Sequence, residues 1–211
     1  DCGENGNNVI ATLDTVTGTL TISGTGKMAD YDKNAPPWAN YKGDIKHLVV
    51  ENGVTSIGDS AFRDCDALID ADMSKASSLE VIKTSFPGCD VLENVVLNEG
   101  LKEIGGSAFN SCKNLKKIHI PSTVTAIGGY CFERCSGLEE VTFADDSKLE
   151  TIAVKTFFDP VLYGSGLKKI TIPKSVKYIQ DSAFSWCNGL KSVTFEPGSG
   201  LTTVALNAFL D

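Results

Sequence analysis

Phenylalanine recurs along this chain at a nearly constant interval, and no other feature of the sequence restricts the fold as strongly. Seven of the ten phenylalanines follow one another at spacings of 24, 23, 23, 25, 27 and 25 residues: Phe62, Phe86, Phe109, Phe132, Phe157, Phe184 and Phe209. A period of this length indicates an array of repeated units. Because one such unit cannot bury its own apolar face, the units are expected to stack side by side as a solenoid.

Two further positions share the period and define the unit more fully. Three residues after five of the phenylalanines stands a cysteine, namely Cys65, Cys89, Cys112, Cys135 and Cys187. Three residues further on stands a leucine, namely Leu68, Leu92, Leu115, Leu138 and Leu190. Counted from these leucines, with Ile45 and Leu167 at the same position, successive units have 23, 24, 23, 23, 29 and 23 residues before a last unit that stops at Asp211.

Each unit follows the pattern L-x-x-I-x-I-P-x-x-V-x-x-I-G-x-x-A-F-x-x-C, and its two halves predict different local structures. Apolar residues alternate in the first half, as in Ile118 and Ile120, which is typical of a short strand with one buried face. A proline or a turn-rich segment then reverses the chain. The second half returns along the opposite side as a second extended piece and a tight helical turn. The expected fold class is therefore a strand-dominated α/β solenoid.

The repeated residues resemble the BspA-like class of bacterial leucine-rich repeats, a type with a period of roughly 23 residues and the signature I-G-x-x-A-F-x-x-C-x-x-L-x-x-I-x-I-P. Residues 104–121, 127–143 and 179–195 match that signature best. The resemblance extends to residues 18–26 and to Pro37 and Trp38, which look like the entry module of that family. It implies a right-handed leucine-rich-repeat horseshoe on a secreted or cell-surface bacterial protein, used for adhesion or protein binding.

Residues 1–44 lie outside the repeat and are expected to form an N-terminal capping module. Residues 9–13 and 19–22 are predicted to be two strands, and the glycine-containing turn between them predicts a β-hairpin. An open solenoid end exposes apolar side chains and strand edges, so a cap is required there. Residues 45–211 then form a solenoid of about six and a half units. Because its last unit is unfinished, we expect the natural chain to continue past Asp211.

The charge balance disfavours two classes of partner. Acidic residues outnumber basic ones 27 to 19, which gives the 211 residues a net charge of -8. A nucleic-acid or anionic-membrane partner would require a basic surface, so neither is expected. No segment approaches the roughly 20 apolar residues that a membrane-spanning helix requires, so membrane insertion is not expected.

The seven cysteines form no metal or redox motif, because no C-x-x-C pair and no Cys/His cluster at zinc spacing occurs. The five repeat cysteines should form an interior column with neighbours about 4.8 Å apart and side chains pointing the same way. We therefore expect buried thiols rather than disulfides. Cys131 takes the place of an alanine of the repeat, whereas Cys2 is either free or bridged to the cap. No metal and no cofactor is expected.

Catalysis is not expected either. A Ser-His-Asp or Cys-His hydrolase needs a histidine beside its nucleophile, and His47 and His119 are the only histidines. The repeat register places both on the solvent side of their strands, three units apart and away from the cysteine column. Asp70 and Asp72 share that side with His47, so a weak surface metal site is conceivable, although a solvated polar face is the favoured interpretation.

The outward positions of the first-half strands predict a binding surface, here called the concave face. Its candidate residues are His47, Val49, Asp70, Asp72, Asn94, Val96, Lys117, His119, Glu140 and Thr142. This face is mixed in polarity, acidic in one patch, and without the aromatic anchors that dominate many interfaces. A merely solvated sheet is the alternative interpretation.

The 29-residue unit is the one clear departure from the period, and its extra residues are a second candidate surface. Insertions in repeat proteins emerge as loops that often carry recognition. Its candidate patch consists of Phe158, Leu162 and Tyr163, with Trp186 from the next unit. These side chains could instead fold back to fill the gap left where Pro160 replaces the column cysteine.

Together these features predict a non-catalytic module for protein–protein interaction or adhesion, on a secreted or cell-surface bacterial protein. The expected partners are host or bacterial surface proteins, and the module itself is expected to be a monomer. The alternative function is structural, a rigid spacer that holds other domains of a longer surface protein away from the cell.

Overall fold

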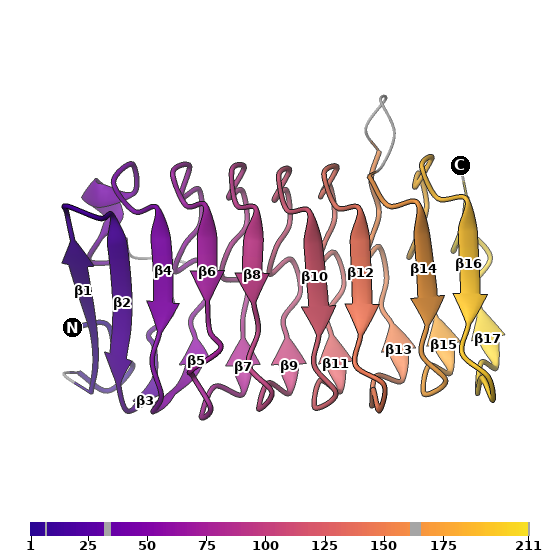
Figure 1. Ribbon diagram of the computed structural model, residues 1–211, viewed down its shortest axis with the longest axis horizontal. Coiled ribbons are helices and arrows are strands. Elements are labelled where there is room, and N and C mark those ends of the chain that lie inside the picture. Colours follow the sequence, from indigo (N-terminus) through magenta and orange to yellow (C-terminus); the bar gives the residue numbers. More distant parts are fainter. Residues whose placement is uncertain (7, 32–34, 161–165, 211) are drawn as a thin grey trace.

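The computed structural model describes residues 1–6, 8–31, 35–160 and 166–210, and in them the chain forms two rows of strands (Figure 1). An antiparallel hairpin, β1 (Val9–Asp14) and β2 (Thr19–Gly24), opens the chain. Each later unit then adds one strand to the front row of Figure 1 and another short strand to the second row. The predicted solenoid and its N-terminal hairpin are thereby confirmed.

The first row is a parallel sheet built on the hairpin, in the order β1-β2-β4-β6-β8-β10-β12. Its further members are β4 (His47–Val50), β6 (Asp70–Asp72), β8 (Asn94–Val96), β10 (Lys117–Ile120) and β12 (Glu140–Phe143). Two more strands, β14 (Lys169–Ile172) and β16 (Ser192–Phe195), continue the row as a separate pair. Side chains alternate along these strands, so that Ile118 and Ile120 are buried while Lys117 and His119 are exposed.

The second row consists of short strands at the other side of the core. One sheet has the order β11-β9-β7-β5-β3 and another the order β13-β15-β17. Their bounds are β3 (Gly26–Lys27), β5 (Val54–Ile57), β7 (Val81–Ile82), β9 (Glu103–Ile104), β11 (Ala126–Ile127), β13 (Thr151–Ile152), β15 (Tyr178–Ile179) and β17 (Thr203–Val204). Turns complete each unit. The described residues contain one helix, the three-residue 3-10 turn Ala39–Tyr41, and no helix long and apolar enough to cross a membrane.

The parallel sheet is interrupted at the long unit, which the repeat pattern did not indicate. In the described residues, β12 and β14 share no paired residues, and β11 and β13 belong to different sheets. The break coincides with the 29-residue unit, whose extra residues precede Leu167. The break in the first row therefore spans the insertion, whereas the second-row strands on either side of it, β13 and β15, remain paired.

The repeated phenylalanines form one continuous column of rings through the core. Neighbouring rings from Phe62 to Phe209 lie 5.0 to 5.6 Å apart between centroids, with planes inclined by 1° to 14°. This geometry is offset stacking, which contributes beyond the apolar area it buries. The column crosses the break in the sheet, because Phe132 and Phe157 stack at 5.5 Å. At the N-terminal end Trp38 extends it, stacked on Phe62 at 5.4 Å.

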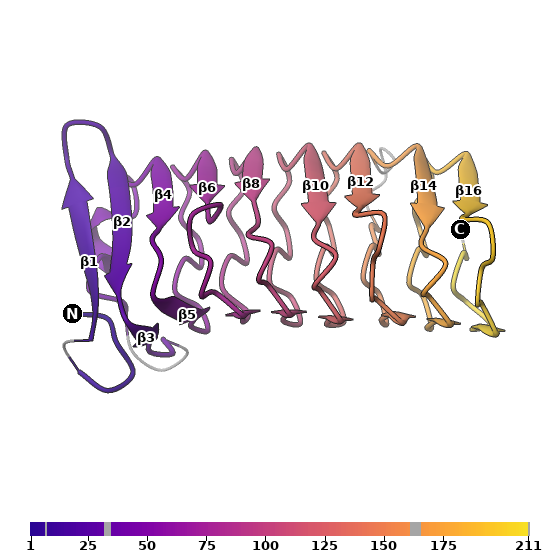
Figure 2. The same cartoon turned by 60° about the horizontal axis from the view of Figure 1, so that its bottom comes forward.

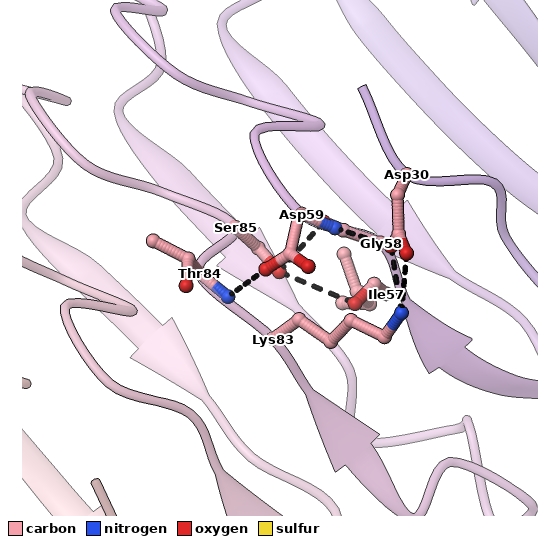
Figure 3. Close-up of polar contacts among 7 residues, drawn as sticks. All are labelled: Asp30, Ile57, Gly58, Asp59, Lys83, Thr84 and Ser85. Carbon is pink, nitrogen blue, oxygen red and sulfur yellow. Dashed lines mark hydrogen bonds and ion pairs between the residues drawn. The ribbon is translucent and has the colours of Figure 1, made fainter. Parts of the chain in front are cut away.

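Polar contacts also connect the cap to the first two units, as Figure 3 shows. The Lys83 ammonium binds both carboxylate oxygens of Asp30, at 2.7 and 2.6 Å, and Asp30 also accepts the backbone N–H of Asp59. The carboxylate of Asp59 in turn accepts the N–H of Thr84 at 2.9 Å. The cap and two successive units are thus linked by one chain of carboxylates.

This linkage predicts a loss of stability in acid. Partial burial disfavours the charged form of Asp30, but Lys83 and the N–H of Asp59 outweigh it, so the pKa of Asp30 lies below its ordinary value. A lowered folded-state pKa stabilises the protein above the unfolded-state pKa, near 3.9, and the contribution is lost as pH falls through the folded value. We expect Asp30→Asn to melt lower than the wild type at pH 7, with the difference shrinking toward pH 2. Melting curves over that range check this, and an unchanged difference at pH 2 would contradict it.

Candidate functional site

The candidate residues of the concave face share one surface of the parallel sheet, as the repeat register predicts. Strand pairing places His47 beside Asp70, Asp70 beside Asn94, Asn94 beside Lys117, and Lys117 beside Glu140. Two residues further along the same strands, Val49, Asp72 and Val96 are aligned in the same way, and His119 pairs with Thr142. Side chains from β8 to β12 are exposed, while those of β4 and β6 are half-buried.

The acidic end of the face is held by specific contacts. Nδ1 of His47 lies 2.6 Å from Oδ2 of Asp70, with both side chains about 40% exposed. The hydroxyl and backbone N–H of Ser74 hold the pKa of Asp72 below its usual range. Because the half-buried carboxylate of Asp72 stays ionised, this end of the face offers negative charge to a partner.

The middle of the face contains a hollow of about 360 Å³ between β8 and β10. These strands share a single residue pair, Lys117 with Asn94, and their separation exposes apolar carbon of Val96 and Leu97. Lys117 and His119 line the other side, together with Glu140 and Thr142 of β12. The hollow could therefore take one apolar side chain of a partner beside one cationic and one anionic group, a feature that the register alone did not reveal.

A second hollow of about 260 Å³ lies at the break between β12 and β14. Glu140 and Thr142 line it from one strand and Lys169 and Thr171 from the next, with Glu196 at its rim. Glu196 was not among the predicted surface residues, because it directly follows β16 and does not occupy an outward strand position of the repeat. The 29-residue length of the unit was the one available signal of this opening.

The cysteines are buried thiols, as the repeat predicts, and four of them have a structural role that the sequence did not show. The thiols of Cys89, Cys112, Cys135 and Cys187 donate to the carbonyl oxygen of the phenylalanine one unit earlier, at 2.9 to 3.3 Å. A small apolar residue would leave that carbonyl without this bond. Cys2 is also a buried free thiol. The column therefore joins successive units and offers no reactive nucleophile.

Thiol reactivity provides a direct check of the cysteine column. Burial raises the pKa of Cys65 to about 12 and that of Cys2 to about 11, so little thiolate exists near pH 8. We expect native protein to react with a thiol reagent more than about 100-fold more slowly than denatured protein, in which all seven cysteines react. Rapid reaction of several thiols in the native state would contradict the buried column.

Only part of the candidate loop patch can be placed. Leu162 and Tyr163 lie outside the described residues. Phe158 is half-buried beneath the ammonium of Lys155, which lies 4.9 Å from its ring centroid, and Trp186 is 43% exposed. Two of the four predicted side chains are therefore at the surface or near it, and the choice between recognition and packing stays a prediction.

The fold does not bring the two histidines together. His119 is hydrogen-bonded to the Thr142 hydroxyl at 2.9 Å and lies three strands away from His47. No group of three or more His, Cys, Asp or Glu side chains among the described residues could hold a metal ion.

Comparison with solved structures identifies the same architecture in bacterial leucine-rich repeat proteins. A leucine-rich cell surface protein of Faecalibacterium prausnitzii aligns with a TM-score of 0.68 at 23% identity, over 90% of this chain and 53% of that one. A leucine-rich repeat protein of Bacteroides ovatus gives 0.65 at 26% identity, over 94% and 54%. The pneumococcal vaccine antigen PcpA gives 0.64 at 23% identity, over 92% and 49%. The chain thus spans about half the length of these three proteins.

The sequence itself matches a defined repeat family. No curated protein matches the chain at a significant level. The profile of the BspA type leucine rich repeat region, in contrast, matches residues 38–160 and 158–211 in six copies. This match covers the whole array of units that the phenylalanine period defines. The chain therefore belongs to the BspA-type leucine-rich repeat family.

Proposed function

We propose that this chain is a non-catalytic protein-binding module of a secreted or cell-surface bacterial protein, and that its concave face is the contact surface. The observation that carries the proposal is the row of exposed side chains on adjacent parallel strands, interrupted by the hollow beside Val96 and Lys117. Such a surface presents many side chains on a rigid support, which suits recognition of another protein. The expected partners are host or bacterial surface proteins, and adhesion is the expected consequence.

Two of the similar solved structures support a location at the bacterial cell surface. The Faecalibacterium prausnitzii protein is a cell surface protein, and the pneumococcal protein is a vaccine antigen. Since they share the fold with this chain at low identity, they support its class and surface location rather than any particular ligand.

Charge reversal on the concave face tests the proposal. The double variant Asp70→Lys, Asp72→Lys changes the acidic end of the face, and Glu99→Lys, Glu103→Lys makes the same change on exposed residues away from it. Host and bacterial surface proteins captured by each variant are compared by quantitative mass spectrometry. We expect the first variant to capture at least ten-fold less of one partner protein than the wild type and the second variant capture. Equal capture by both variants would contradict the assignment of this face.

The continuous column of rings favours the spacer as a second candidate function. Stacking that persists from Trp38 to Phe209 makes the units one stiff body, as a spacer requires. A spacer needs no specific partner. Capture of no surface protein by any form of the chain, wild type included, would therefore favour this candidate over the binding module.

A further inference from the structure

The outer edge of β1 ends the parallel sheet and offers its main chain to another strand. β1 is the terminal strand of its sheet and pairs with β2 over six residues in regular register. Figure 2 shows it at one end of the molecule, above the N-terminal segment. An edge strand usually carries a lysine, a proline or a bulge that prevents pairing with another chain. The sequence of β1, VIATLD, has no lysine or proline, and its pairing has no bulge.

Hydrogen bonds of the hairpin show which residues of β1 face outward. The carbonyls of Asn8 and Asp14 accept bonds on the hairpin side, from Thr25 and Gly18. Because bonding alternates along an antiparallel strand, Val9, Ala11 and Leu13 direct their N–H and C=O groups to the outer edge. Val9 already accepts the N–H of Cys2 at 2.8 Å. Among the described residues nothing bonds to the outward backbone groups of Ala11 and Leu13, so two donors and two acceptors are open there.

An uncharged hollow lies beside the same edge. It measures about 310 Å³ and is lined by Ala11 and Leu13 of β1 together with the side chains of Leu20, Trp38 and Tyr41. Tyr41 is 50% exposed, so part of its ring is open to a partner. Open main-chain groups next to an apolar hollow are the combination that an added β-strand uses, since the main chain supplies bonds and the hollow takes alternate side chains.

We propose that two copies of this chain associate through their β1 edges, antiparallel, about a two-fold axis at Thr12. This register places Ala11 of each copy opposite Leu13 of the other, so that all the open groups bond across the axis. It also places Asp14 opposite Ile10, which separates the two Asp14 carboxylates by about 14 Å along the strands.

The neighbouring registers are less favourable. A two-fold axis at Ala11 would place Leu13 of one copy opposite Val9 of the other. The carbonyl of Val9 already accepts a hydrogen bond from the N–H of Cys2. An axis at Leu13 would require Thr15, which lies in the hairpin turn, and would bring the Asp14 carboxylates closer together. In the favoured register the two parallel sheets join into one, so the pair presents two concave faces side by side. This pairing goes beyond the proposed binding of a foreign partner, and it differs from the monomer expected from the sequence.

Disulfide trapping tests the register. In the proposed pair the two Thr12 residues oppose each other without hydrogen bonds, at a Cα separation of about 4.5 Å, which a disulfide can span. We expect Thr12→Cys to form a covalent dimer under mild oxidation, at least ten-fold more than Ile10→Cys. Ile10 lies on the same face of β1 and is 47% exposed, but its two copies would be about 14 Å apart. The native cysteines are buried and do not compete. Equal cross-linking of the two variants would overturn the proposal.

Sedimentation velocity tests the association without a cross-link. Over a concentration series, the wild type is expected to shift from monomer toward dimer. Thr12→Lys places two like charges at the axis and should leave only monomer, whereas Thr21→Lys, one strand further in on the same face, should dimerise as the wild type does. A wild type that stays monomeric throughout, or a dimer that survives Thr12→Lys, would overturn the proposal. In the latter case the exposed Phe209 and Leu210 at the other end of the solenoid would be the interface to test.

Discussion

Phe109→Ala is expected to lower the free energy of unfolding by about 3–5 kcal/mol, a large part of the roughly 5–15 kcal/mol that stabilises a protein domain. Phe109 is fully buried and stacks on Phe86 at 5.3 Å and on Phe132 at 5.6 Å. Its removal leaves a cavity in a close-packed core and ends the stacking on both sides. Because each unit contacts only its neighbours, the loss falls on the two interfaces around one unit. Chemical denaturation followed by circular dichroism measures the change.

The last ring of the column provides a matched control. Phe209 stacks on one neighbour, Phe184, and is 40% exposed. The same substitution there removes one stacking contact instead of two and less buried area, so Phe209→Ala should cost less than half as much as Phe109→Ala. If the two substitutions cost the same, the column would not be the main support of the solenoid.

Gly58→Ala is expected to destabilise the protein by about 2 kcal/mol or more through a steric clash between the cap and the first unit. A methyl group on Gly58 would overlap with the carbonyl oxygen of Ala29 and lie 3.3 Å from the backbone nitrogen of Asp30. The chain could relieve this only by moving the cap away, which would also strain the bonds of Asp30 to Asp59 and Lys83 (Figure 3). Thermal melting and hydrogen exchange of residues 1–44 would show the loss.

Gly43→Ala is the control for this substitution. Nothing lies within 4 Å of the position that its added carbon would take. Replacing that glycine should therefore leave the melting temperature unchanged or slightly higher, because alanine restricts the unfolded chain more. An equal loss from both substitutions would mean that close contact between Gly58 and Ala29 does not hold the cap in place.

The period and its apolar alternation were sufficient to predict most of the fold. The spacing of Phe62 to Phe209 identified the repeated unit, and the alternation around Ile118 and Ile120 identified buried and exposed sides of a strand. These predictions succeeded because every unit repeats the same local pattern and packs against adjacent units of the same structure. The residues of the concave face followed from register alone, since strands of equal phase align their side chains.

Three features depended on tertiary geometry that the repeat pattern does not contain. The break between β12 and β14 arises from how an insertion is accommodated, and length alone does not fix that. The bonds from the cysteine thiols to phenylalanine carbonyls depend on the offset between adjacent units. The open edge of β1 required knowledge of which backbone groups the hairpin uses. In each case the residues could be read from the sequence, but their distances across units could not.

Site-specific photo-cross-linking tests most directly whether the concave face is the binding surface. A photoreactive residue at Val96, 48% exposed at the centre of the face, is compared with one at Glu103 on the second row of strands. Both forms are mixed with the same extract of host and bacterial surface proteins and irradiated. We predict cross-linking of a discrete partner at position 96 and none at position 103. Cross-linking of that partner at position 103 but not at position 96 would contradict the account.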